Sequence, residues 1–101
     1  MGRYAAAHEM FGHMLSVAPN SATTYNNLGS LYLAEHRYAD AVQSLSHAIA
    51  INPELANAHN GLGVAFAQLG QMDRAVVEWR KAIELRPDLS DARDNLAHVR
   101  R

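Results

Sequence analysis

The chain has 101 residues, of which 49% are hydrophobic; nine Lys and Arg against ten Asp and Glu give a net charge of -1, and cysteine is absent. This length predicts one small domain with a stable core, while the lack of cysteine excludes disulfides, thiolate metal sites and thiol catalysis. Without a basic excess, neither nucleic acid nor an anionic membrane is an expected partner. The apolar runs are too short to span a bilayer, and no secretory signal is visible, so we expect a cytoplasmic protein.

The sequence repeats itself with a period of 34 residues. Pro19, Pro53 and Pro87 have this spacing, and the same shift superposes Ala41 on Ala75. Within each period, apolar residues recur every three or four positions, which is the pattern of amphipathic helices, and proline interrupts helices because it lacks the amide donor. These signals predict six helices, over residues 3–17, 22–35, 38–51, 56–69, 72–85 and 90–100.

Two complete periods share a set of spaced positions. The first has Tyr25, Leu28, Gly29, Tyr32, Ala41, Leu45, Ala48 and Pro53, and the second has His59, Leu62, Gly63, Phe66, Ala75, Trp79, Ala82 and Pro87. The small residues suit a close crossing of two helices. This pattern resembles the tetratricopeptide repeat family, and only His59 departs from it, at a position usually filled by Trp, Tyr or another large side chain. The resemblance covers the whole chain and implies an all-α fold, a right-handed α-solenoid of antiparallel helix pairs.

The period divides the single domain, residues 1–101, into four parts. Residues 1–21 match the second half of a repeat, 22–55 and 56–89 are complete repeats, and 90–101 match a first half acting as a C-terminal cap. A repeat buries its hydrophobic face only against a neighbour, yet the first helix keeps an apolar face of Tyr4, Phe11, Met14, Leu15 and Val17. Two interpretations stay open: the chain was cut from a longer array, or this face packs against another copy, as a dimer or a head-to-tail oligomer.

The first helix of each unit is expected to line the concave side of the array. Its outward positions are the candidate peptide-binding residues: Thr23, Asn26, Asn27, Ser30, Asn57, Asn60, Val64, Gln68, Asp94, Asn95 and His98. No charged residue lies in 20–34 or 55–69, so the basic residues with which some members of the family clamp a terminal carboxylate are missing at the matching positions. The asparagines instead resemble the ladder with which other arrays hold an extended peptide. A carboxamide both donates and accepts hydrogen bonds, so we expect recognition of the peptide backbone in an uncharged groove.

Chemistry at a metal or a nucleophile is not expected. Among six histidines, His8 and His13 are five residues apart, not the four that would place both on one helix face; we predict no metal site and no cofactor. No nucleophile or phosphate-loop motif is present, so the chain is not expected to be an enzyme. The sequence therefore predicts a protein-interaction scaffold. The alternatives are a self-assembling structural module and a docking or regulatory fragment of a larger enzyme.

Overall fold

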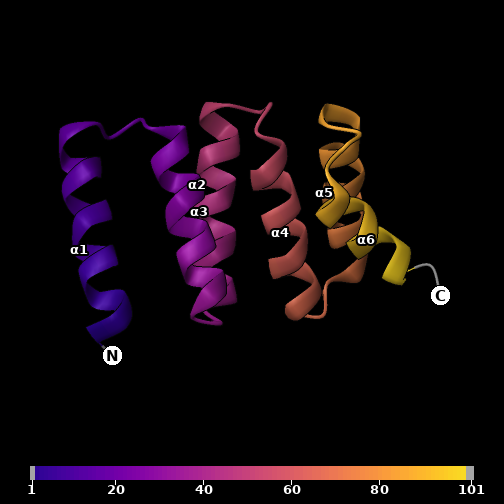
Figure 1. Ribbon diagram of the computed structural model, residues 1–101, viewed down its shortest axis with the longest axis horizontal. Helices are drawn as coiled ribbons and strands as arrows, with labels where there is room; N and C mark the ends of the chain where they lie inside the picture. Colours follow the sequence, from indigo (N-terminus) through magenta and orange to yellow (C-terminus); the bar gives the residue numbers. More distant parts are fainter. Residues whose placement is uncertain (1, 100–101) are drawn as a thin grey trace.

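The computed structural model describes residues 2–99, and these form six helices without any strand (Figure 1). The helices are α1 (Gly2–Val17), α2 (Ala22–Ala34), α3 (Tyr38–Ile51), α4 (Ala56–Gln68), α5 (Met72–Leu85) and α6 (Ser90–Val99). The predicted helices are confirmed to within one residue at each end, except that the predicted end of the sixth helix, Arg100, lies outside the described residues. The all-α class is confirmed as well.

The helices stack side by side along the long axis of a body measuring 41 × 28 × 20 Å (Figure 1). The most extensive packing joins α2 with α3 and α4 with α5. Between these pairs, α3 packs on α4, and α5 packs on α6. The buried core accordingly forms two clusters, one centred on Leu45 and Leu62 and the other on Trp79 and Leu96. Phe66 packs against both clusters and makes the core continuous.

Each helix pair turns through the same C-terminal cap. Helix α2 ends at Ala34 with Glu35 as its C-cap, and the next residue, His36, has a left-handed backbone with φ of 60°. The amide of Arg37 then donates to the Tyr32 carbonyl at 2.9 Å, and that of His36 donates to the Leu33 carbonyl at 3.0 Å, which together form a Schellman motif. Gly70 has φ of 79° in the corresponding turn after α4. This cap ends both helices one residue before their predicted ends.

Two glycines allow the helices of a pair to cross closely. A Cβ atom at Gly29 would lie 2.5 Å from Leu45, and one at Gly63 would lie 2.5 Å from Trp79. Because real Cβ contacts are longer, any larger residue would force the helices apart. The remaining repeat positions divide by burial: Ala41, Ala48, Leu62, Ala75 and Ala82 are buried, Leu28, Tyr32 and Phe66 are half-buried, and Pro53 and Pro87 are exposed.

His59, the departure from the repeat pattern, is buried in a polar contact between α4 and α5. The residue is 4% exposed. Its Nε2 lies 2.8 Å from the Pro53 carbonyl, and its Nδ1 lies 2.8 Å from Oε1 of Glu78. Since a carbonyl can only accept, Nε2 carries a hydrogen and donates it. The ring therefore connects α4, α5 and the turn before α4.

Helix α1 is attached less firmly than the others. It packs against α2 alone, and none of its described side chains is fully buried. The His8 ring lies 5.1 Å from that of Tyr32, and its Nε2 lies 2.6 Å from the Glu35 carboxylate. On α1, Met10, Met14 and Val17 are 53%, 38% and 74% exposed, and their spacing places them on one face. Part of the apolar surface of α1 thus stays exposed.

Replacing Ala41 with leucine tests the close packing of the helix pair. Ala41 is fully buried on α3, so we expect Ala41→Leu to lower the free energy of unfolding by about 3 kcal/mol through overpacking. The control is Ala39→Leu on the exposed side of the same helix, which should change stability by less than about 0.5 kcal/mol. Urea denaturation followed by circular dichroism measures both, and equal stability of the two variants would contradict this packing.

Removing the Glu78 carboxylate tests the polar contact of His59. Glu78→Ala leaves Nδ1 of a buried ring without its hydrogen-bond partner, so we expect a loss of about 1–3 kcal/mol in unfolding free energy. Glu84→Ala is the matched control, because Glu84 is an exposed residue of the same helix. In urea denaturation, Glu78→Ala should have a lower free energy of unfolding than Glu84→Ala. A Glu78→Ala protein as stable as the control would show that the contact contributes nothing.

Candidate functional site

Helices α2, α4 and α6 form the inner layer of the array. Helix α2 contacts α4, and α4 contacts α6, whereas no such contact joins α3 to α5 in the described part of the chain. Neighbouring pairs are therefore closer together on the side of α2, α4 and α6 than on the opposite side. The array curves toward this layer, and its outward residues line the concave face.

The structure leaves every predicted peptide-binding residue accessible on this layer. Thr23, Asn27, Ser30, Asn57, Gln68, Asp94 and His98 are exposed, whereas Asn26, Asn60, Val64 and Asn95 are half-buried. The face is uncharged over α2 and α4, because neither helix contains Lys, Arg, Asp or Glu. Among these three inner helices, only α6 contains acidic residues, Asp91 and Asp94. A ligand lying along α2 and α4 would thus meet neutral polar groups.

Two of the predicted asparagines meet between neighbouring inner helices. Nδ2 of Asn95 on α6 donates to Oδ1 of Asn60 on α4 at 3.1 Å. This bond uses one hydrogen of Asn95 and one lone pair of Asn60, so the Asn60 amide hydrogens and the Asn95 oxygen stay available. Asn27 lies on the exposed side of α2. Asn60 and Asn95 therefore present a donor and an acceptor side by side, which is the pair of groups that a peptide unit requires.

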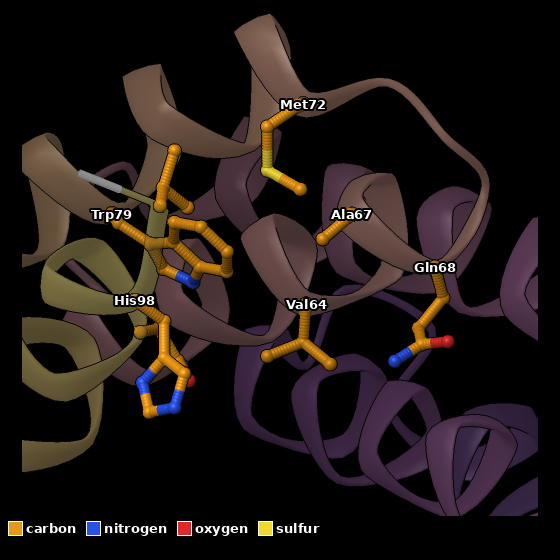
Figure 2. A pocket seen from close by; sticks show the side chains of 8 residues that line it. Val64, Ala67, Gln68, Met72, Trp79 and His98 are labelled. Carbon is orange, nitrogen blue, oxygen red and sulfur yellow. The ribbon is translucent and has the colours of Figure 1, made fainter. Parts of the chain in front are cut away.

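A pocket of about 230 Å³ opens at the α6 end of this face (Figure 2). Its lining residues are Val64, Ala67, Gln68, Met72, Trp79, Asn95, His98 and Val99. Four of these were predicted as binding residues: Val64, Gln68, Asn95 and His98. Sequence reasoning missed Met72 and Val99, and it placed Trp79 only among the repeat positions. The predicted residues Thr23, Asn26, Asn27, Ser30, Asn57, Asn60 and Asp94 do not line this pocket.

Other kinds of site find no support in the described residues. Within residues 2–99, no three His, Asp or Glu side chains lie close enough together to hold a metal ion. None of the helices described above combines the length and hydrophobicity that crossing a bilayer requires. The groups that the concave face offers are carboxamides, hydroxyls, an imidazole, the carboxylates of Asp91 and Asp94, and apolar side chains. These groups suit non-covalent binding.

Comparison with known families identifies the repeat. A family model described as TPR repeat matches residues 29–70, and another described as tetratricopeptide repeat matches residues 56–89. The chain belongs to the tetratricopeptide repeat family. Members of this family are generally protein-interaction modules rather than enzymes. The comparison with curated proteins gave no significant match.

Solved structures of other proteins share this fold. The first TPR domain of Spaghetti (RPAP3), solved with the HSP90 peptide SRMEEVD, is 22% identical with a TM-score of 0.92, over 97% of this chain and 78% of that chain. The TPR domain of Arabidopsis OM64 is 21% identical with a TM-score of 0.93, over 98% and 82% of the two chains. MamA is 27% identical with a TM-score of 0.81, over 87% of this chain and only 52% of that chain. At this level of identity, the similarity concerns the fold.

Proposed function

We propose that this tetratricopeptide domain is a scaffold that binds an extended, neutral peptide along its concave face. The observation that carries the proposal is the hydrogen-bonded pair of Asn60 and Asn95 on adjacent inner helices, 3.1 Å apart. Their remaining donor and acceptor match the carbonyl and amide of one peptide unit. Asn27 on α2 presents a third carboxamide on the same layer. Binding of this kind reads the backbone and tolerates varied side chains.

The charge of the face narrows the class of peptide. The structural neighbour from Spaghetti was solved with a peptide that carries three acidic residues. In this chain, α2 and α4 supply no basic side chain to such a peptide, and Asp91 and Asp94 on α6 would repel it. An uncharged segment loses no ion hydration on binding to this face. We therefore propose a neutral peptide as the ligand.

Alanine substitution of the three carboxamides tests this proposal. A phage library of random dodecapeptides, selected on the immobilised domain, provides the probe, and isothermal titration calorimetry gives its affinity. We expect the combined change Asn27→Ala, Asn60→Ala and Asn95→Ala to weaken binding about a hundredfold, at about 1 kcal/mol for each amide. Thermal unfolding should change little, because Asn27 is exposed and the half-buried Asn60 and Asn95 are removed together, which leaves neither partner of their hydrogen bond unpaired.

A matched control shows whether the loss of affinity is specific to polar groups on the concave face. Gln43→Ala with Ser46→Ala removes two exposed polar groups from α3, in the outer layer, and should leave affinity within about twofold. Equal affinities of the triple variant and the wild type would overturn the proposal. Selected peptides that are predominantly acidic would contradict its charge argument.

We propose self-association through α1 as a second candidate function, because a specific surface favours it. Of the predicted self-association residues, Met14 is exposed, whereas Tyr4, Phe11 and Leu15 are half-buried. Met14 belongs to an exposed row with Val17, which the sequence also placed on this face, and with Met10, which sequence reasoning missed. Flexible methionines adapt to a partner surface of irregular shape. Burying this row against a second copy would remove apolar area from water.

Size-exclusion chromatography with light scattering tests this candidate. We expect the 11.1 kDa chain to show a mass above that of the monomer at millimolar concentration, and Met14→Glu to restore the monomer. Val77→Glu is the control, because Val77 is an exposed apolar residue of α5, at 50% exposure, away from α1. A wild-type protein that stays monomeric, or an oligomer that both variants retain, would contradict association through α1.

A further inference from the structure

The pocket at the α6 end of the concave face has a cause that can be traced to one repeat position. Leu33 of α2 and Ala67 of α4 are 34 residues apart and therefore occupy the same place in successive repeats. The Leu33 side chain packs against the first core cluster, and its Cδ1 would lie 3.5 Å from a Cβ atom at Gly61. In the second repeat, Ala67 is too short to fill the equivalent space. The pocket lies where the leucine is missing (Figure 2).

Trp79, one of the residues that line this pocket, carries a buried hydrogen-bond donor. The residue is 4% exposed, and its Nε1 has no hydrogen-bond partner within residues 2–99. A Cβ atom at Gly63 would lie 2.5, 2.7 and 2.9 Å from Nε1, Cδ1 and Cε2. Such similar distances place Gly63 over the face of the five-membered ring, so the N–H bond points past it. Figure 2 shows the indole projecting between Met72 and His98, toward Val64. Buried indole N–H groups usually have a partner.

The size and polarity of the pocket select one kind of occupant. Its volume of about 230 Å³ exceeds the roughly 150 Å³ of a cavity that holds benzene. It is smaller than the roughly 300–1,000 Å³ of small-molecule sites, so it suits a single large side chain. The walls are mainly apolar, and no lining residue is Lys, Arg, Asp or Glu. A charged side chain would therefore lose its hydration without compensation.

We propose that this pocket binds a tyrosine side chain of the peptide held on the concave face, with the tyrosine hydroxyl accepting a hydrogen bond from Trp79 Nε1. Tyrosine combines an aromatic body with an oxygen that accepts hydrogen bonds. Phenylalanine has no acceptor, and the thioether of methionine is a weak one. The inference rests on the proposed function, since the remainder of the peptide lies along α2 and α4. It adds a preference for one side chain to a surface that otherwise recognises the backbone.

The single tryptophan of the chain supplies the readout. The probes are acetylated, amidated Gly-Ser peptides with one central tyrosine, phenylalanine or alanine. In proton–nitrogen correlation spectra, the chain gives one indole cross-peak, that of Trp79. We expect the tyrosine peptide to move this peak downfield and to bind about fivefold more tightly than the phenylalanine peptide. The alanine peptide should leave the indole peak in place.

Two variants test the contribution of the pocket independently of the remainder of the concave face. Ala67→Leu copies Leu33 of the preceding repeat and should fill the pocket, so that tyrosine, phenylalanine and alanine peptides bind equally while thermal stability is retained. Trp79→Phe removes the donor and keeps an aromatic ring, and calorimetry should then show equal affinity for tyrosine and phenylalanine. If Trp79→Phe fails to fold, Ala67→Leu still decides the matter.

The outcomes distinguish this inference from the proposed function. Shifts of the Asn27 and Asn60 amide peaks without a shift of the indole peak would overturn the tyrosine pocket and leave peptide binding intact. Equal affinity of wild-type protein for the tyrosine and phenylalanine peptides would overturn the hydrogen bond. A tyrosine peptide that moves no peak would also overturn the inference. The proposed function is then judged separately, by the selected dodecapeptides and the triple asparagine variant.

Discussion

The close crossing of the two helices in each repeat is the constraint on which the remainder of the molecule depends. At Gly29 and Gly63 a side chain is replaced by hydrogen, and the space is taken by Leu45 and Trp79 from the paired helix. Protein interiors are close-packed, so this contact fixes the separation within each pair. With the pairs rigid, α2, α4 and α6 lie together in the inner layer. The concave face and its carboxamides follow from that arrangement.

The two complete repeats have the same fold but different contacts at one equivalent position, that of Tyr25 and His59. In the first repeat, the Tyr25 ring stacks on His47, with ring centres 4.0 Å apart. In the second repeat, His59 replaces this tyrosine and is held by Glu78 and the Pro53 carbonyl. A buried imidazole requires such partners, because an unpaired polar group loses its hydration. The substitution is tolerated because Glu78 stands where the first repeat has Ser44.

The sequence allowed the helices to be predicted because their signals are local. Proline, glycine and the spacing of apolar residues act within a few positions, so all six helices were placed to within one residue over the described chain. Helices α2 and α4 end one residue before their predicted ends, because the cap depends on backbone angles at His36 and Gly70. Of these two residues, only the glycine is a type that favours such angles. The pocket was missed for another reason: its lining comes from three helices. The 34-residue period places Ala67 at the position of Leu33, but only the structure shows that Trp79 and His98 line the same pocket as Ala67.

The two ends of the array differ in how well they accept another helix. The outer side of α6 has Arg93 where the complete repeats have Tyr25 and His59, and an exposed Ala97 where they have glycine. At those glycines, even one added Cβ would collide with the large residue of the paired helix. Phe11 of a second copy would meet both the methyl group of Ala97 and the charge of Arg93. These two residues argue against head-to-tail completion of the repeat, so the association proposed through Met10, Met14 and Val17 would be a symmetric contact of α1 with its own copy. Association through α1 would then close as a dimer and leave the concave face open.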